Sequence, residues 1–291
     1  MSIVITGASG NLGRLVATAV LDGADPSDVV LVTRDPSRLS DLAGRGADVR
    51  AGDFTDPASL ARAFAGATRV LVISADRIGS RVPGHKAAID AAVAAGAESI
   101  AYTSGVNPSD SNPIAVMGEH RATEEHLRAS GAGWTMLRNS IYAEILVAGA
   151  APALATGRHF SNEGDGRVSY VARADCAAVA AAVLLTGGHD GKEYDVTGPE
   201  ALGATDVAGL YAEVGGRPVE AVLVGDDVYA AGLVEHAGMP EPVARTYTTF
   251  GTGARRGYSA PVSTTVADLT GRQPTSARDV LAAKRAVLEG G

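Results

Sequence analysis

The sequence contains only one cysteine, and it has no apolar run long enough to cross a membrane. Cys176 therefore has no partner for an internal disulfide, a cysteine zinc cluster or a dithiol redox pair, and its alanine-rich surroundings predict a buried helix position. The longest apolar stretches, such as Cys176 to Leu185, fall short of the ~18–20 residues that span a bilayer. The apolar segment from Ser2 to Thr6 is too short for a secretory leader. We therefore expect a cytoplasmic protein without a membrane partner.

Clusters of basic residues are missing as well. The chain carries 25 Lys and Arg against 33 Asp and Glu, a formal net charge of −8. Because nucleic acids and anionic membrane surfaces both reward clustered cations, neither is an expected partner. There is also no low-complexity block, no repeat of fixed period and no Pro/Ser-rich linker. The length and the 46% of apolar residues indicate a globular chain of about two domains with a full hydrophobic core.

Short β-branched runs alternate with helix-length segments through the first half of the chain. Because these runs lack strict polar alternation, we expect burial on both faces, which is typical of a parallel sheet covered by helices. Asp56 before Pro57 marks a helix start, and Gly96 and Gly131 mark helix ends. The predicted fold class is α/β, a Rossmann-type doubly wound parallel sheet. Its expected strands are Ile3–Thr6, Val29–Thr33, Ala47–Arg50, Val70–Ser74, Ser99–Thr103 and Thr135–Arg138.

The alternation loosens after about Arg138. We interpret residues 1–140 as the main domain and residues 141–291 as a smaller α/β lobe, with one or two strands of the lobe returning to the main sheet. Helices are expected near Asp175–Leu185, Thr205–Val214, Asp226–Ala237 and Ala277–Leu288, and strands near Gly166–Val171, Glu193–Thr197 and Val219–Val224.

A glycine-rich string, Thr6-Gly7-Ala8-Ser9-Gly10-Asn11-Leu12-Gly13, follows the first expected strand and opens into the helical pattern from Leu15 to Leu21. Its glycines permit a tight strand-to-helix turn and close approach of the backbone to a pyrophosphate, while the free N–H groups and the helix dipole attract the anion. A glycine-rich turn alone would be a permissive loop, but this context predicts dinucleotide binding. The expected contacts are Gly7, Ser9, Gly10, Asn11, Leu12 and Gly13.

The end of the second strand bears on the choice of nucleotide. Sites that prefer NAD place Asp or Glu there, whereas this strand ends in Arg34 and Arg38 follows one turn later. Because a guanidinium fork suits a phosphate, the two arginines favour the 2′-phosphate of NADPH. Asp35 keeps the ribose hydroxyl of NADH open, and two solvated arginines around the helix start at Pro36 are the other interpretation.

Further cofactor contacts are expected where later strands end. Asp53 can accept a hydrogen bond from the adenine amino group while Phe54 covers the ring, although a capping role would also explain Asp53. Ligands of open α/β sheets bind outside the carboxyl ends of the strands. We therefore expect Ser74, Ala75 and Ser104 beside the nicotinamide, and we expect no metal site.

Together these residues resemble the NmrA-like branch of the atypical short-chain dehydrogenase/reductases, and more closely the bacterial NmrA-like NADPH:quinone oxidoreductases. The resemblance covers nearly the whole chain and thins after about residue 200. It implies that the stretch with Asn139, Ser140 and Tyr142 contacts nicotinamide and substrate, and ordinary packing is the alternative for Tyr142. Arg173 precedes the helix expected at Asp175 and either reaches the cofactor or substrate or forms a surface salt bridge. The strings are Ile5-Thr6-Gly7-Ala8-Ser9-Gly10-Asn11-Leu12-Gly13, Arg34-Asp35-Pro36-Ser37-Arg38, Ile100-Ala101-Tyr102-Thr103-Ser104, Glu119-His120-x-x-Thr123-Glu124, Leu137-Arg138-Asn139-x-x-Tyr142-x-Glu144 and Arg173-Ala174-Asp175.

The wider superfamily carries a Tyr-x-x-x-Lys pair on its fifth helix, and this pair is absent. The expected helix from Ala115 to Ser130 has no Tyr and no Lys, and His120-x-x-x-Glu124 stands at that spacing. A ketone needs an acid on hydride transfer, whereas a quinone becomes a phenolate with a pKa of about 10 and needs little help. We therefore expect direct hydride transfer from NADPH to a quinone or quinone-like small molecule. No flavin is expected, because the chain offers one nucleotide fingerprint.

His120 and Tyr142 are the candidate catalytic residues. Helical spacing places His120 on one stripe with Val116, Thr123 and Leu127, which indicates an inward face, and Glu124 at i+4 could orient it. A packed helix histidine without a catalytic role is the alternative. Two other functions stay open: a non-catalytic redox sensor that binds NADP(H), and a tailoring reductase or isomerase of an aromatic natural product. The oligomeric state is also open, a homo-oligomer included.

Overall fold

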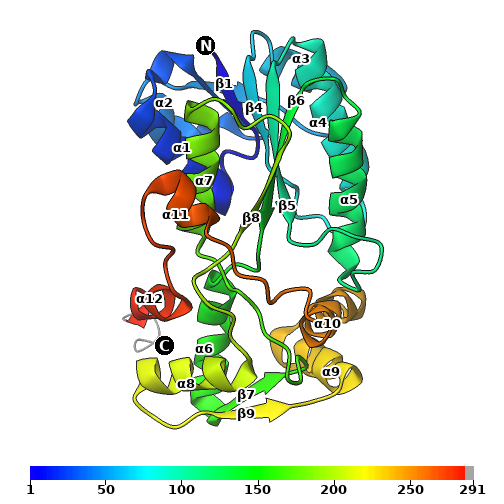
Figure 1. The fold of residues 1–291 in the computed structure, drawn as a ribbon, viewed down its shortest axis with the longest axis vertical. Helices are drawn as coiled ribbons and strands as arrows, with labels where there is room; N and C mark the ends of the chain where they lie inside the picture. Colours follow the sequence, from blue (N-terminus) through cyan, green and yellow to red (C-terminus); the bar gives the residue numbers. More distant parts are fainter. Residues whose placement is uncertain (286–291) are drawn as a thin grey trace.

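The computed structural model describes residues 1–285, and a seven-stranded sheet forms its centre (Figure 1). The strand order is β3-β2-β1-β4-β5-β6-β8, and every neighbouring pair is parallel. The order reverses between β1 and β4, which confirms the doubly wound α/β fold. The strands are β1 (Ile3–Ile5), β2 (Val29–Thr33), β3 (Asp48–Ala51), β4 (Arg69–Val72), β5 (Ser99–Gly105), β6 (Gly133–Asn139) and β8 (Lys192–Val196).

Helices cover both faces of this sheet (Figure 1). Neighbouring strand residues point to opposite faces, so Ile3 and Ile5 join one apolar core and Val4 joins the other. This two-sided burial explains the unbroken apolar runs of the strands. One face is covered by α1 (Asn11–Gly23), α7 (Arg173–Leu185) and α11 (Thr265–Thr270), and the other by α3 (Pro57–Ala63), α4 (Val82–Ala94) and α5 (Ala115–Arg128). Short turns of helix flank β2: η1 (Pro26–Asp28) precedes it, and η2 (Pro36–Leu39) and α2 (Ser40–Ala43) follow it.

The remaining elements form a lobe beyond the carboxyl ends of the strands (Figure 1). Apolar side chains of α6, α8 and α12 share a third core, and β7 pairs in parallel with β9. Strand β8 returns from the second half of the chain to pair with β6, as expected. The lobe consists of α6 (Glu144–Thr156), β7 (Arg158–Ser161), α8 (Ala204–Gly215), β9 (Glu220–Leu223), α9 (Asp226–Ala237), α10 (Glu241–Arg255) and α12 (Ala277–Ala282).

The helix starts and ends predicted from single residues are confirmed. The Asp56 side chain accepts hydrogen bonds from two backbone N–H groups of the first turn of α3, and Pro57 is the first residue of that helix. Gly96 and Gly131 follow α4 and α5 with φ values of +85° and +84°, a region that favours glycine. Cys176 is buried on α7, as predicted.

The predictions of secondary structure that differ from the structure lie in the second half of the chain. The strand expected over Gly166–Val171 is wrong, because Val168 and Val171 form only isolated bridges, with Leu202 and Tyr142. The helix expected from Ala277 to Leu288 is shorter, since α12 ends at Ala282, and residues 286–288 lie outside the described residues. Helices α6, α10 and α11 and strand β7 were not predicted. Helix α10 is rich in Thr and Gly, which are poor helix formers.

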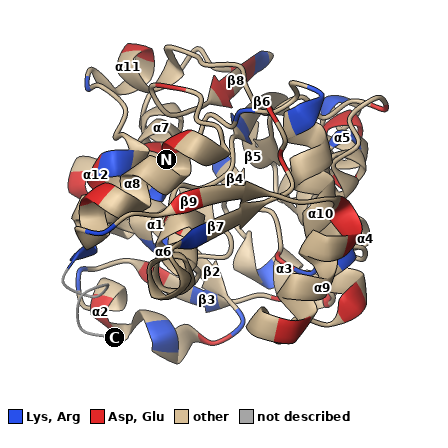
Figure 2. Ribbon diagram, turned by 90° about the horizontal axis from the view of Figure 1, so that it is seen from below, with Lys and Arg blue, Asp and Glu red and all other residues tan. Residues whose placement is uncertain are grey.

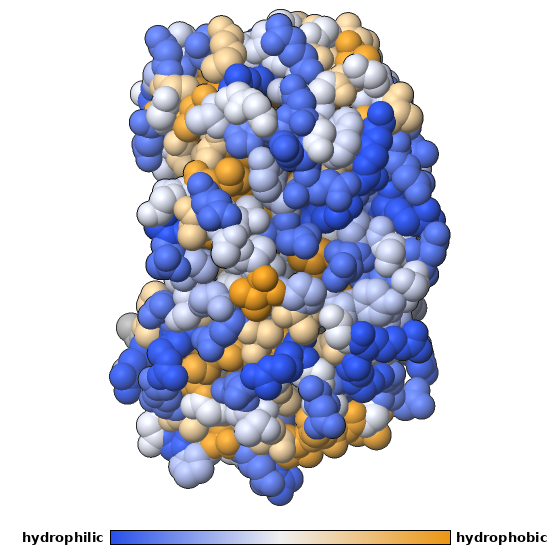
Figure 3. All heavy atoms as spheres, in the orientation of Figure 1, coloured by the Kyte–Doolittle hydropathy of each residue, from blue (hydrophilic) through white to orange (hydrophobic). Residues whose placement is uncertain are grey.

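The surface carries charges of both signs, and its exposed apolar groups gather on the lobe (Figure 2 and Figure 3). Seen from the lobe end, acidic and basic residues are interspersed along the ribbon (Figure 2). On the face in Figure 3, hydrophobic residues show mainly over the lower part, the lobe. Exposed apolar side chains of the lobe include Phe160, Leu223 and Val228. Within residues 1–285, no helix combines the length and the hydropathy that a membrane span requires.

Candidate active site

The turn between β1 and α1 requires glycine at two positions. Gly7 has a φ of +60°, which favours glycine. A Cβ on Gly13 would lie 2.2 Å from the Gly7 carbonyl oxygen, so only glycine permits this close packing of helix on strand. Gly10 donates its N–H to the same oxygen at 2.9 Å, and a Cβ there would lie 3.2 Å from it. The backbone is thus folded tightly around Gly7.

Helix α1 has an uncapped N-terminus, which suits an anion. Its N-cap, Gly10, provides no side-chain hydrogen bond, and the first turn contains no acidic residue. The first N–H groups of a helix have no intrahelical acceptor, and the helix dipole favours negative charge beside them. Leu12 is buried, so a ligand would meet its backbone N–H, whereas Asn11 is exposed. The Ser9 and Thr33 hydroxyls, 2.8 Å apart, join this turn to the end of β2.

The arginines after β2 are exposed and available. Within residues 1–285, the guanidinium groups of Arg34 and Arg38 form no hydrogen bond and no ion pair. The neighbouring carboxylate is engaged, since Asp35 accepts from the hydroxyl and the N–H of Ser37 at 2.6 and 3.1 Å. These two hydrogen bonds lower the pKa of Asp35 and cap η2. Two free cations therefore lie where the nucleotide ribose was expected.

Asp53 and Phe54 combine structural contacts with a position near the arginines. Asp53 accepts from the N–H and the hydroxyl of Thr55, each at 2.8 Å. These bonds lower the pKa of Asp53, and the positive charges of Arg34 and Arg77 act in the same direction. The ring of Phe54 meets that of His85 edge-on, with centroids 6.2 Å apart. Asp53 thus shapes its own turn, and Arg77 is a nearby cation that sequence reasoning missed.

The end of β4 is tied to the protein through its backbone. The N–H of Ser74 donates to Thr103 Oγ1 at 2.8 Å, and the N–H of Ala75 donates to Nε2 of His85 at 2.9 Å. The Ala75 carbonyl accepts from Arg81 Nη1 at 3.1 Å. Both backbone polar groups of Ala75 therefore form hydrogen bonds inside the protein, and its N–H is not available to a ligand.

Two buried polar atoms at the ends of β5 and β6 have no partner in the described part of the chain. They are Ser104 Oγ and Asn139 Oδ1, on residues that are 5% and 8% exposed. An unpaired buried polar group costs about 1–3 kcal/mol, so a ligand or water is expected to complete these two. Ser140 differs, because its hydroxyl lies 3.1 Å from that of Ser169.

Tyr142 lies against Arg173 and Asn139. The Arg173 guanidinium sits 4.8 Å from the Tyr142 ring centroid, and Asn139 Nδ2 donates to the Tyr142 hydroxyl at 3.3 Å. The Glu144 carboxylate accepts from the Arg173 N–H at 3.0 Å and lies 3.9 Å from its guanidinium. Desolvation raises the pKa of Tyr142, so the phenol keeps its proton at neutral pH.

His120 is buried on α5 together with Val116, Thr123 and Leu127, which confirms the predicted inward face. The expectation that Glu124 orients it is wrong, because that carboxylate binds Arg138 and Arg128. Instead, the Tyr102 hydroxyl lies 2.9 Å from Nδ1 of His120. Burial, with smaller contributions from Arg81 and His85, lowers the pKa of His120 well below its usual value, so the ring is neutral.

Sequence reasoning gave no role to Tyr102 or His85. Tyr102 was visible only as part of the string Ile100–Ser104, and His85 lies in a segment without a motif. Both become functional candidates through contacts between β5, α4 and α5.

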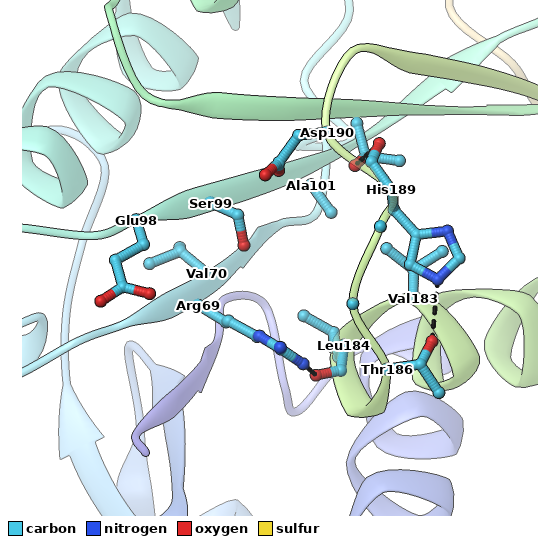
Figure 4. A pocket seen from close by; sticks show the side chains of 13 residues that line it. Arg69, Val70, Glu98, Ser99, Ala101, Val183, Leu184, Thr186, His189 and Asp190 are labelled. Atoms are coloured by element: carbon cyan, nitrogen blue, oxygen red, sulfur yellow. Dashed lines mark hydrogen bonds between the residues drawn. The ribbon is translucent and has the colours of Figure 1, made fainter.

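A small cavity of about 100 Å³ lies at the opposite, amino edge of the sheet (Figure 4). Arg69 and Ser99 begin β4 and β5, and Thr186 and His189 come from the segment after α7. Because ligands of this fold bind at the carboxyl edge, this cavity is not part of the candidate site.

Comparison with known proteins agrees with this geometry. Residues 7–186 match the model of the NAD(P)H-binding family. The chain belongs to this family. It is 36% identical over 274 residues to quinone oxidoreductase 2 of Escherichia coli (strain K12), covering 94% of this chain and 95% of that protein. The resemblance inferred from the sequence motifs is therefore confirmed.

Solved structures also resemble this NAD(P)H-binding protein along nearly its whole length. The E. coli NADPH-dependent quinone oxidoreductase complexed with NADPH has a TM-score of 0.92 and 35% identity, covering 99% of each chain. Triphenylmethane reductase of Citrobacter sp., complexed with NADP(H), has a TM-score of 0.91 and 31% identity, covering 97% of this chain and 99% of that one. The uncapped α1 and the unpaired Ser104 and Asn139 atoms suit such a cofactor.

Proposed function

We propose that this protein is an oxidoreductase that uses NADPH to reduce a quinone or quinone-like small molecule by direct hydride transfer, without flavin. The observation that carries the proposal is the whole-length similarity to E. coli quinone oxidoreductase 2. The carboxyl edge of the sheet supports it, since it offers a helix N-terminus at one end and unpaired polar atoms at the other. Nothing in the site favours a sensor or a tailoring enzyme.

Each part of the cofactor has a proposed set of contacts. The pyrophosphate is held at the N-terminus of α1, the 2′-phosphate by the exposed arginines, and the nicotinamide half beyond β4, β5 and β6. The proposed pyrophosphate contacts are Gly7, Ser9, Gly10, Asn11, Leu12 and Gly13, and the 2′-phosphate contacts are Arg34 and Arg38. Asp53 and Phe54 are the proposed adenine contacts. The proposed contacts of the nicotinamide half are Ser74, Ala75, Ser104, Asn139, Ser140 and Arg173.

The chemistry divides between cofactor and protein. Bound NADPH supplies the hydride. The side chains of His120 and Tyr142 position the acceptor. Neither is an obligatory acid, because the product of hydride transfer is a phenolate that water can protonate. Asn139 and Arg173 keep Tyr142 in place through the contacts to its hydroxyl and ring.

The proposal extends to the organisation of the chain. Residues 1–140 bind the nucleotide and residues 141–291 contribute the acceptor side, although β8 and α7 return to the main sheet. We place the protein in the cytoplasm with a small-molecule acceptor as its partner. Its oligomeric state is a question for a measurement of mass in solution.

Oxidation of NADPH by flavin-free protein in the presence of a simple naphthoquinone tests the function. We expect steady turnover with formation of one hydroquinone per NADPH. Tight nucleotide binding without turnover on naphthoquinone or benzoquinone would contradict the proposal and favour a sensor.

A further inference from the structure

A chain of buried hydrogen bonds connects the end of β4 to His120. The N–H of Ala75 donates to Nε2 of His85 at 2.9 Å. Nδ1 of His85 lies 3.2 Å from Thr123 Oγ1 and 3.4 Å from the Tyr102 hydroxyl. The same hydroxyl lies 2.9 Å from Nδ1 of His120. The chain therefore joins a predicted nicotinamide contact to a predicted catalytic residue.

The proton of His85 can be assigned from its partners. An amide N–H only donates, so Nε2 of His85 accepts and carries no proton. Burial, assisted by the positive charge of Arg81, lowers the pKa of His85 to about 4, which keeps the ring neutral near pH 7. Its single proton is therefore on Nδ1, and this atom donates toward Thr123 and Tyr102.

The direction of the Tyr102 hydrogen bond follows. Burial raises the pKa of the Tyr102 phenol, so the hydroxyl keeps its proton. Nδ1 of His85 is already a donor and cannot receive it. The Thr123 hydroxyl donates its own proton to the Glu119 carbonyl at 2.9 Å and accepts from His85. The hydroxyl contact at hydrogen-bond distance to an atom that can still accept is the 2.9 Å contact to Nδ1 of His120, and we assign the Tyr102 proton to it. Neutral His120 then bears its proton on Nε2.

The Nε2 edge of His120 lies at the carboxyl end of β5. The ring carbon bonded to Nε2, Cδ2, is 3.5 Å from the position that a Cβ would take on Gly105. Gly105 follows Ser104, whose buried hydroxyl is unpaired within residues 1–285. Nε2 of His120 has no hydrogen-bond partner in the same part of the chain. A donor thus points to the edge where the nicotinamide half is proposed to bind.

We infer that Tyr102 and His85 are positioning residues that hold His120 as its Nε2–H tautomer, so that His120 donates a hydrogen bond to the carbonyl oxygen of the acceptor. This inference rests on the proposed function. The hydride brings two electrons and one hydrogen to the quinone, and negative charge develops on the carbonyl oxygen. A solvent proton completes the hydroquinone, while His120 keeps its own proton. A donor already oriented toward this charge lowers the barrier.

Histidine side-chain nitrogen NMR measures the tautomers directly. The chain has six histidines, so His120→Gln and His85→Gln assign the two signals. We expect protonation at Nε2 in His120 and at Nδ1 in His85, with or without NADPH. In Tyr102→Phe, His120 should lose this preference. An Nδ1–H tautomer of His120 in the unmodified protein would overturn the inference, even if Tyr102→Phe fails to fold.

The chain offers a matched control for the kinetics. The Tyr194 hydroxyl lies 2.9 Å from Nδ1 of His189, a pair of the same kind at the amino edge of the sheet. Tyr102→Phe should lower kcat for naphthoquinone about 5- to 20-fold and leave the Kd for NADPH unchanged, because the donor remains but loses its orientation. Tyr194→Phe should leave kcat unchanged. Equal kcat in all three proteins would reject the positioning role.

The two experiments separate the inference from the proposed function. The tautomers are read without any quinone, so an inactive protein with the expected tautomers refutes quinone reduction and leaves the hydrogen-bond directions standing. An active protein whose His120 tautomer does not respond to Tyr102→Phe refutes the positioning role alone.

Discussion

Glu124 on α5 holds Arg138 on β6 through two hydrogen bonds, Nε to Oε1 at 3.0 Å and Nη2 to Oε2 at 2.8 Å. The Glu124 side chain is only 1% exposed, and it also accepts from Arg128 at 2.9 Å. The carboxylate one turn after His120 therefore fixes α5 to the sheet and takes no part in orienting the histidine.

Replacing Glu124 should accordingly affect stability before activity. Glu124→Ala leaves two guanidinium groups short of a partner, one of them largely buried, and breaking such a pair costs about 3–5 kcal/mol. Urea unfolding measures the loss. Glu125→Ala, which removes an exposed i,i+4 pair with Arg121, is the control and should cost less than about 0.5 kcal/mol. Equal losses in the two variants would contradict this account.

Arg34 should select NADPH over NADH. Its guanidinium is exposed and unpaired within residues 1–285, so Arg34→Ala should weaken NADPH binding by about 1.5–3 kcal/mol and leave NADH binding nearly unchanged. Calorimetric titration of both nucleotides measures this difference. Arg62→Ala, at another exposed arginine on α3, should change neither. Equal affinity of the unmodified protein for both nucleotides would refute the assignment.

Substitutions of different glycines should affect NADPH binding and protein stability separately. Gly10 has an extended backbone, φ −79° and ψ 171°, that valine adopts, so Gly10→Val should abolish NADPH binding and largely preserve the fold. Gly13→Ala should destabilise the protein, because its Cβ meets the Gly7 carbonyl oxygen. Gly209→Ala on α8 meets nothing within 4 Å and should stabilise by about 0.5–1 kcal/mol. Thermal unfolding with and without NADPH distinguishes the three, and normal NADPH binding by Gly10→Val would show the fingerprint to be misplaced.

Acid should destabilise the fold through its buried histidines. Burial lowers the pKa of His85 and of His159 to about 4, against about 6.5 in the unfolded chain. Between these pH values only the unfolded chain binds the protons, so the free energy of unfolding falls as pH drops from about 6.5 to about 4, by about 1–3 kcal/mol per histidine. Urea unfolding across this window should show a smaller slope for His85→Gln than for the unmodified protein. The exposed His236→Gln is the control, and an unchanged slope in His85→Gln would count against the buried neutral ring.

Loss of His120 or Tyr142 should be mild for an enzyme without an obligatory acid. We expect His120→Ala and Tyr142→Phe each to lower kcat/KM less than about 10²-fold, partly through KM, as for residues that position the acceptor. Because the pKa of His120 is well below its usual value, activity should not fall as pH rises through about 6–7. A loss beyond about a thousandfold with NADPH affinity retained would indicate true acid catalysis instead.

The local geometry of the proposed nucleotide site could be predicted from sequence, because its determinants lie close together in the chain. The glycine turn, the arginines after β2 and the cap at Asp56 each act within a few residues of chain, and the parallel sheet follows from runs buried on both faces. The lobe was less readable. Helix α10 lacks helix-forming residues, and the segment over 166–171 has strand composition but pairs only through isolated bridges.

The sequence by itself determined the α/β sheet, the glycine turn at Gly7 and the exposed arginine at position 34. The tertiary structure decided which partner each buried polar group received. Glu124 stands at helical spacing from His120, yet its carboxylate accepts hydrogen bonds from Arg138 on β6. The group beside Nδ1 of His120 is the hydroxyl of Tyr102 on β5. Side chains at i and i+4 share a helix face only approximately, whereas a buried charge must be paired, so packing of α5 on β5 and β6 overrode the local spacing.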